Sequence, residues 1–315
     1  MKDFVTDKVK NIKPSGIRKF FDIVASSGGD IISLGVGDPD FVTPWEIRNA
    51  AVISLQKGIT HYTSNIGLPE LREEISKYLK SRFSVRYAAD EIMLTIGASE
   101  AIDAALRAVV DEGDEVLIPD PSYVSYAPLV QLCGGVPVAV PCSAENGFKL
   151  TPEMLEKRIT AKTKALIFPY PNNPTGGIME KEYLKALVPV ILKHDILVIS
   201  DEIYAELTYG GRHVSVASLP GMKERTVLIN GFSKAFAMTG WRIGFVCAPP
   251  ELDDALFKIH QYGIMCAPSA SQYAAIEGLK DGFTDNFSVV ESMREEYDKR
   301  RRFMTRFFNE NGLPC

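Results

Sequence analysis

Short, continuously apolar runs alternate with amphipathic stretches through the middle of this chain, and this alternation constrains the fold more than any other feature. The amphipathic stretches include 99–110, 181–194 and 250–261. Strands that are apolar on both faces and separated by helices are typical of a mostly parallel sheet covered on both sides. The predicted fold class is therefore α/β, with a mostly parallel, doubly wound sheet. The expected strands are 92–96, 115–118, 136–140, 164–168, 196–200, 226–229 and 244–246.

Length and composition narrow the classes of function. A chain of 315 residues is too long for one small core and suits a large domain with a smaller one. The 35 Lys and Arg against 40 Asp and Glu give a net charge of −5, spread along the chain, so we expect no nucleic-acid partner and no membrane surface. No apolar run is long enough to span a membrane, and residues 1–16 lack the apolar core of a secretion signal.

The five cysteines show no CxxC pair and no metal spacing. We interpret them as reduced thiols of a cytoplasmic protein, with three or four of them in the core. No metal is expected.

The two ends of the chain differ from its middle. We expect residues 1–44 to form an arm and part of the small domain, with a helix near 17–25, and 45–282 to form the large domain. Residues 283–315 are expected to start a C-terminal part of the small domain, mainly as one charged helix over 287–309 that ends at Asn311-Gly312. Because that helix leads to no further element, we expect part of the small domain to be absent from this chain.

Unusual residues follow the carboxyl ends of the predicted strands, where open α/β sheets bind ligands. Gly97-Ala98-Ser99 begins a helix, and free backbone N–H groups at such a point favour a phosphate. Ser99 can add a hydroxyl donor, or it can be a plain N-cap. Tyr123 follows the next strand and can stack on a flat cofactor ring or simply pack in a turn.

Two further strands end in polar residues. Asn173 precedes a proline, which extends its backbone, and its amide can donate to a phenolate-type oxygen; the alternative is a simple turn. Asp201 closes an apolar strand, and a buried carboxylate needs a partner such as a protonated pyridine nitrogen. Tyr204, three residues later, can reach the same ring. A metal site or an N-cap at Asp201 is the alternative, although the histidines show no ligand spacing.

Lys234 stands just beyond strand 226–229 in an apolar, glycine-flanked segment. A lysine among apolar groups can lose its proton near neutrality and act as a nucleophile and then as a base. Arg242 lies eight residues later between glycines and offers a two-pronged phosphate clamp. Segment 60–71, which contains Tyr62, precedes a helix, and its function cannot be inferred from its residues alone.

The pattern SKxxxxxGxRxG over 233–244, with NNPTG at 172–176 and SDEIY at 200–204, resembles fold-type I pyridoxal-phosphate enzymes, in particular class I/II aminotransferases. The resemblance covers Ile32 to at least Gly282. It implies pyridoxal 5'-phosphate as cofactor, bound by the large domain 45–282. Lys234 looks like the lysine that holds the cofactor as a Schiff base, and Asp201 like the partner of the pyridine nitrogen.

The same resemblance assigns the other candidate residues. Tyr204 and Asn173 are similar to the donors to the phenolate oxygen, and Tyr123 to the residue that stacks on the ring. Gly97, Ala98 and Ser99 match the phosphate-binding turn, with Arg242 as its clamp. Tyr62 matches a tyrosine that reaches the phosphate of the other subunit, which implies a homodimer. Gly37, with Asn173, matches the substrate site.

Two departures from the family pattern stand out. Many members have a serine three residues before the lysine; here that residue is Gly231, and Ser233 is the candidate to replace its phosphate contact. The family's arginine for the substrate α-carboxylate would lie beyond position 315.

The implied activity is transfer of an amino group from an L-amino acid to a 2-oxo acid by a ping-pong mechanism. Several segments are closest to bacterial aminotransferases for N-acetyl-diaminopimelate, aromatic amino acids or aspartate. The alternatives are a pyridoxal-phosphate-dependent β-lyase on the same fold, an inactive fragment, and a non-enzymatic ligand-sensing domain.

Overall fold

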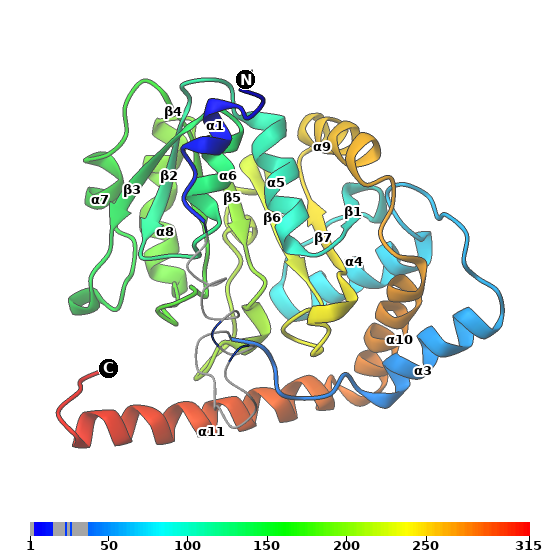
Figure 1. Cartoon of the computed structure of the whole chain (residues 1–315). Coiled ribbons are helices and arrows are strands. Elements are labelled where there is room, and N and C mark those ends of the chain that lie inside the picture. Colours follow the sequence, from blue (N-terminus) through cyan, green and yellow to red (C-terminus); the bar gives the residue numbers. More distant parts are fainter. Residues whose placement is uncertain (1–2, 15–22, 24–25, 27–36) are drawn as a thin grey trace.

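A seven-stranded sheet forms the centre of the molecule (Figure 1). The computed structural model describes residues 3–14, 23, 26 and 37–315, so the helix predicted near 17–25 lies, apart from Ile23, outside the described residues. The order of the strands across the sheet is β1-β7-β6-β5-β4-β2-β3. The strands are β1 (Ile92–Thr95), β2 (Glu115–Asp120), β3 (Val136–Pro141), β4 (Thr163–Phe168), β5 (Leu197–Asp201), β6 (Thr226–Gly231) and β7 (Gly244–Cys247).

Helices connect these strands and continue beyond the last one. The α-helices are α1 (Asp7–Lys10), α3 (Trp45–Gln56), α4 (Pro69–Phe83), α5 (Ala98–Val109), α6 (Tyr126–Leu132), α7 (Pro152–Glu156), α8 (Lys181–Lys193), α9 (Pro250–Gly263), α10 (Ser269–Asp285) and α11 (Ser288–Glu310). Short 3-10 turns are η1 (Ala89–Glu91), η2 (Ala144–Asn146), η3 (Ala205–Leu207), η4 (Val216–Ser218), η5 (Lys223–Arg225) and η6 (Thr239–Trp241).

The prediction of a mostly parallel α/β sheet is confirmed. β2 pairs in parallel with β3 and β4, and β4, β5 and β6 continue the parallel series. β7 alone runs the other way among these strands, because it pairs antiparallel with both β6 and β1. Consequently the carboxyl ends of the other strands and the beginning of β7 lie at one edge of the sheet.

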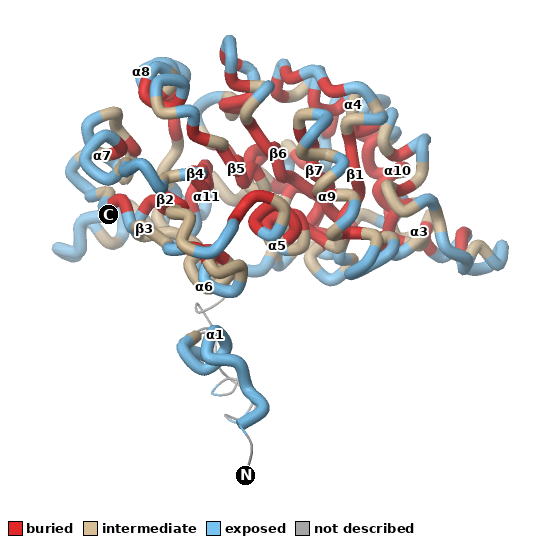
Figure 2. Tube along the Cα trace, turned by 90° about the horizontal axis from the view of Figure 1, so that it is seen from above, coloured by how far each residue is buried: buried red, intermediate tan, exposed pale blue. Residues whose placement is uncertain are grey.

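The core lies on both faces of the sheet, and the strands divide their side chains between the two faces. Val227 and Ile229 pack with Leu106 of α5 and Leu256 of α9, whereas Leu228, between them in sequence, packs on the opposite face. This alternation follows from the two-residue period of a strand. Figure 2 shows most strands as buried segments between helices whose outer sides are exposed, whereas β3 at the end of the sheet is largely exposed or half-buried.

One expectation about the core is wrong. Of the five cysteines, Cys247 alone is buried; Cys133, Cys142 and Cys266 are half-buried and Cys315 is exposed. All five are free thiols. In the described part of the chain, no helix is both long and apolar enough to cross a membrane. The same residues contain no group of three or more His, Cys, Asp or Glu arranged to hold a metal ion.

The long helix α11 is attached to the sheet domain through a buried charge cluster. Arg82 of α4 donates from Nε and Nη2 to the two carboxylate oxygens of Glu206 at 2.9 and 2.7 Å, and Nη2 also donates to Glu291 of α11 at 2.6 Å. Tyr78 donates to the same Glu206 carboxylate at 2.8 Å. The exposed fractions of the Arg82 and Glu206 side chains are 10% and 6%. The proposed division of the chain near residues 44 and 282 stays a prediction.

Removing Arg82 should destabilise the fold strongly. In Arg82→Met, Glu206 keeps its burial but loses its cation, and such a change typically costs about 3–5 kcal/mol of the free energy of unfolding. Lys185→Met is the matched control, because Lys185 pairs with Glu182 while the two side chains are 53% and 79% exposed, and exposed pairs contribute roughly 0–1 kcal/mol. Urea unfolding of both variants measures the difference. Equal losses would contradict the assignment of the cluster as the main polar attachment of α11.

Candidate active site

A cavity of about 410 Å³ opens at the edge of the sheet where the parallel strands end. Most residues singled out from the sequence line it, although they come from separate segments of the chain. Five further residues of the lining, which were not predicted as site residues, are Ile102, Tyr126, Pro171, Ile203 and Thr239. The predicted residues in the lining are Gly37, Ala98, Ser99, Tyr123, Asn173, Asp201, Tyr204, Ser233, Lys234 and Arg242.

Lys234 lies in the turn that follows β6 and is half-buried. Its Nζ donates a hydrogen bond to the Gly37 carbonyl oxygen at 3.1 Å and lies 5.8 Å from the centroid of the Tyr204 ring. Burial lowers the pKa of this lysine, and the positive charge of Arg242 lowers it further, against the opposing effect of Asp38. A larger fraction of Lys234 is therefore neutral at a given pH than of an exposed lysine. The neutral amine is the form that attacks carbonyl groups.

Asp201 is the last residue of β5, and only 7% of its surface is exposed. Its Oδ2 accepts from the Tyr126 hydroxyl at 2.8 Å, and its Oδ1 accepts from the Ile203 N–H at 3.2 Å. Burial raises the pKa of this carboxyl even though Tyr126 and Ile203 stabilise the ionised form. An adjacent cationic nitrogen in the cavity would offset that burial.

Tyr126 is a site residue that the sequence reasoning missed. It is the first residue of α6, is buried, and packs edge-on against Tyr123 with ring centroids 5.5 Å apart. One signal was present: a second aromatic residue stands three positions after Tyr123, the spacing that places two side chains on one face of a helical turn. The contact with Asp201 spans 75 positions, and no local pattern reports it.

Tyr204 lies next to Lys234 and Asn173 in the lining of the cavity. Burial raises the pKa of its hydroxyl to about 12, against a smaller opposing hydrogen bond with Asn173. The hydroxyl therefore keeps its proton at neutral pH and can donate it to an acceptor in the cavity. Asn173 is exposed at the cavity mouth, where its amide is open to a ligand.

The helix α5 begins at the phosphate-binding turn inferred from the sequence. Gly97 is its N-cap, with φ of +88°, and makes no side-chain cap hydrogen bond. Ser99 is already inside the helix, so the interpretation of Ser99 as a plain N-cap is wrong. The first N–H groups of a helix have no partner within it, which makes this turn suited to an anion.

Arg242 lies over this turn. Its Nη2 donates to the Ile96 carbonyl oxygen at 3.2 Å and its Nη1 to the Thr239 carbonyl oxygen at 2.9 Å. A Cβ on Gly97 would lie 2.7 Å from Nη2, so the guanidinium can occupy this place because residue 97 is a glycine. The combination of a cation, a helix start and Ser99 provides donors for a phosphate at one end of the cavity.

Two more glycines bring the strands together behind the turn. A Cβ on Gly244 would lie 2.9 Å from the Gly97 carbonyl carbon, and a Cβ on Gly231 would lie 2.9 Å from the Gly244 Cα. A serine at position 231 would therefore require a shift of backbone, which gives a physical reason for glycine at this position. Ser233, 8% exposed, lines the cavity two residues further along.

Tyr62 is separate from this cavity. Its side chain is not part of the lining, and 78% of the residue is exposed. The chain segment that follows it is nevertheless held firmly, since Gln272 accepts from the Leu68 N–H at 2.8 Å and donates to Thr63 at 3.0 Å. Tyr62 is thus an exposed residue next to a well-held segment and outside the lining of its own active-site cavity.

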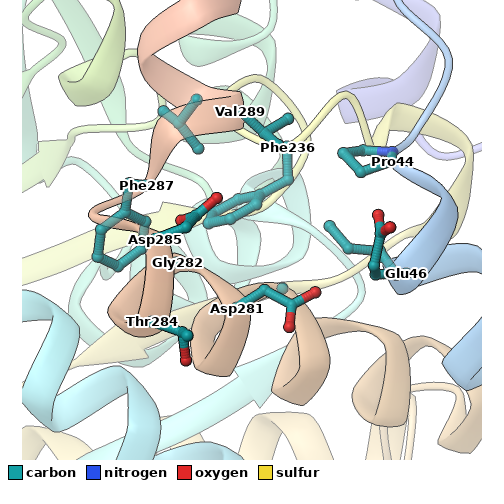
Figure 3. Close-up of a pocket in the computed structure, with 12 residues that line it drawn as sticks. Pro44, Glu46, Phe236, Asp281, Gly282, Thr284, Asp285, Phe287 and Val289 are labelled. Atoms are coloured by element: carbon teal, nitrogen blue, oxygen red, sulfur yellow. The ribbon is translucent and has the colours of Figure 1, made fainter.

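A second cavity, of about 300 Å³, lies between α3, α10 and the start of α11. Figure 3 shows the Phe236 ring at its centre, with Phe287 on one side and the carboxylates of Glu46, Asp281 and Asp285 around it. Burial and the other two carboxylates raise the pKa of Asp281. Its described lining contains neither a basic group nor any residue singled out from the sequence, so we do not assign the active site there.

The comparisons with known proteins agree with this geometry. The chain matches the family "Aminotransferase class I and II" over residues 29–315. The protein YugH of Bacillus subtilis (strain 168) is 54% identical over 316 residues, covering 100% of this chain and 81% of its own length. The aspartate aminotransferase of Pyrococcus abyssi is 47% identical over 312 residues, covering 98% and 79% respectively.

A solved structure gives the same result for the fold. The structure of an aspartate aminotransferase from Thermus thermophilus with maleate superposes with a TM-score of 0.93 at 35% identity. The match covers 99% of this chain and 81% of the Thermus thermophilus chain. The resemblance inferred from the motifs is confirmed: this chain belongs to the class I and II aminotransferase family, whose members use pyridoxal phosphate.

Proposed function

We propose that this protein is a pyridoxal-phosphate-dependent aminotransferase that moves an amino group from an L-amino acid to a 2-oxo acid by a ping-pong mechanism. The observation that carries the proposal is the placement of Lys234 and Asp201 in one cavity. The first is an amine whose pKa is lowered by burial, and the second is a buried carboxylate whose pKa is raised by burial. A nucleophilic amine and an anion that needs a cation are the two groups that such a cofactor requires.

The residues of the cavity fit the cofactor. Its phosphate would be held by Arg242 and the start of α5 at Ala98 and Ser99, with Ser233 as a further donor. Asp201 would pair with the pyridine nitrogen, and Tyr126 holds that carboxylate in place. Tyr123 would lie against the ring, and Tyr204 and Asn173 would donate to its phenolate oxygen. The volume of about 410 Å³ is within the usual range for small-molecule sites.

When bound, pyridoxal phosphate supplies an electron sink that stabilises negative charge on the carbon next to the amine. The chain's own contribution is proton transfer and orientation. Lys234 Nζ, an amine whose pKa is lowered by burial, would take the α-proton of the amino donor and later return a proton. Positioned general acid–base groups contribute about 10²–10⁴-fold in rate.

The substrate would lie on the Gly37 side of the cavity, where the Gly37 carbonyl oxygen already contacts Lys234. Asn173, at the mouth, is suited to hold the substrate's carboxylate. Arg242 is the one arginine among the described residues of the lining, and it is committed to the phosphate end. Selection among donor amino acids therefore depends on groups outside this lining.

We also propose that the working form is a homodimer. Tyr62 is held on a fixed segment, is 78% exposed and lies outside its own cavity. A tyrosine in this position can complete the phosphate site of a second copy.

Replacing Lys234 should abolish covalent attachment of the cofactor and amino transfer together. Lys234→Ala removes the amine but leaves the phosphate turn, so pyridoxal phosphate should still bind without a covalent link. Borohydride reduction and mass spectrometry measure the link, and a screen of L-amino acids with 2-oxoglutarate measures the transfer. In the unaltered protein we expect a reduced adduct on Lys234 and a 2-oxo acid product.

The matched control is Lys185→Ala, because Lys185 is an exposed lysine on α8 that pairs with Glu182. It should keep both the adduct and the transfer. An adduct that persists in Lys234→Ala would refute the role of Lys234. Release of pyruvate and ammonia without an acceptor would identify a β-lyase instead.

The pH dependence of attachment should follow the charges around Lys234. Attachment requires the neutral amine, so its rate rises with pH and levels off above the lysine's pKa. Because burial lowers that pKa, the plateau should begin at a lower pH than for an exposed lysine. Asp38 raises the pKa, so Asp38→Asn should move the curve to still lower pH. Stopped-flow absorbance with pyridoxal phosphate measures the curves.

Asp40→Asn is the control, because Asp40 pairs with Arg300 of α11 and does not contribute to the shift at Lys234. Its curve should coincide with that of the unaltered protein. A curve for Asp38→Asn that moves to higher pH would contradict the electrostatic account of Lys234.

A further inference from the structure

A buried histidine–glutamate pair lies directly behind the phosphate turn. His260, on α9, is 0% exposed, and its Nδ1 lies 2.6 Å from Glu100 Oε1. Its Nε2 lies 2.9 Å from the Asn65 carbonyl oxygen. The side chain of Glu100 is 9% exposed. Neither residue lines the active-site cavity, and neither was singled out from the sequence.

The two contacts of the imidazole fix the net charge of the pair. A carbonyl oxygen only accepts hydrogen bonds, so Nε2 must carry a hydrogen where it faces Asn65. Nδ1 faces a carboxylate oxygen at 2.6 Å, and that contact also needs a proton between the two atoms. Whether this proton belongs to the imidazole or to the carboxyl, histidine and glutamate together carry no net charge.

Glu100 is connected to the phosphate turn through one residue, Ile96. It is the third residue of α5, and its Oε2 accepts from the Ile96 N–H at 2.5 Å. The carbonyl oxygen of the same Ile96 accepts from Arg242 Nη2 at 3.2 Å. Glu100 and Arg242 therefore hold residue 96 from its two sides, immediately before Gly97.

The charge of Glu100 matters because of its place in the helix. A carboxylate in the first turn of a helix is ordinarily favourable, since it compensates the helix dipole. At a helix that binds phosphate the same negative charge competes with the ligand for that dipole and repels it. A proton supplied with His260 removes this conflict and leaves the hydrogen bond to Ile96 in place.

We propose that His260 is a positioning residue that neutralises Glu100, so that the start of α5 can bind the phosphate group of the cofactor. This inference rests on the proposed function, because it assumes that the phosphate lies at Gly97–Ser99. Glu100 orients the turn, and His260 neutralises the charge of Glu100. The pair acts through residue 96, since neither side chain lines the cavity.

The test compares pyridoxal phosphate with pyridoxal, which has the same ring without the phosphate. Dissociation constants for both are measured by absorbance titration. His260→Asn keeps a donor toward Glu100 but cannot carry the extra proton. It should weaken the binding of pyridoxal phosphate about tenfold and leave the binding of pyridoxal nearly unchanged. Glu100→Gln is neutral and can still bond Ile96 and His260, so it should keep the unaltered preference for the phosphate form.

The double variant His260→Asn with Glu100→Gln gives the sharpest result. His260→Asn leaves the Glu100 charge uncompensated, and Glu100→Gln removes that charge. It should recover most of the affinity that His260→Asn loses. His213→Gln is the matched control: His213 Nε2 forms a similar buried contact, 2.9 Å from Glu202 Oε2, outside the lining of the active-site cavity. This control should not change the preference, whatever it does to stability.

Parallel losses of affinity for both ligands in His260→Asn, or no recovery in the double variant, would overturn the inference. Urea unfolding of each variant shows whether it is folded at the titration temperature. If His260→Asn does not fold, Glu100→Gln decides alone, and a reduced preference for the phosphate form counts against the inference. An unaltered protein that binds both ligands equally would overturn the proposed function itself.

Discussion

Close contact between the backbones of Gly97, Gly244 and Gly231 sets the position of the groups at the phosphate end of the cavity. Side chains at these positions would meet neighbouring backbone or the Arg242 guanidinium within about 3 Å. Because glycine has no side chain, β1, β7 and β6 approach closely and the Arg242 guanidinium lies on the turn before α5. Lys234 follows at the end of the next strand. A catalytic lysine and a phosphate clamp thus share one rigid piece of sheet.

The site also depends on buried charges whose partners come from other layers of the fold. Asp201 stays in place because Tyr126 donates to it from the start of α6. Glu100 is held by His260 from α9. Farther from the cavity, Arg82 joins Glu206 and Glu291 and so attaches α11 to the sheet domain. In each case a charged or polar group that burial would penalise is satisfied by a residue from a different element.

Local patterns in the sequence were sufficient for the strands, for four of the helices and for much of the lining of the site. The ends of the seven strands agree with expectation within two residues, because a strand that is buried on both faces is recorded as an unbroken apolar run. Residues such as Asp201, Asn173 and Lys234 follow strand ends, so a parallel sheet necessarily gathers them at one edge. Their chemical roles remain those of the proposed function.

What the sequence by itself determined is the α/β class, the positions of the strands and of the helices α5, α8, α9 and α11, and the family to which the motifs belong. The tertiary structure decided the rest. The reversal of β7 places Arg242 at the ligand edge although it precedes a strand. Tyr126 meets Asp201 across 75 positions, and His260 meets Glu100 across 160. The packing also decided which cysteines are buried, and of the five only Cys247 is. The physical reason is common to all of these: periodicity and turn chemistry act between neighbours in the chain, whereas strand direction, burial and charge pairing depend on which distant segments pack together.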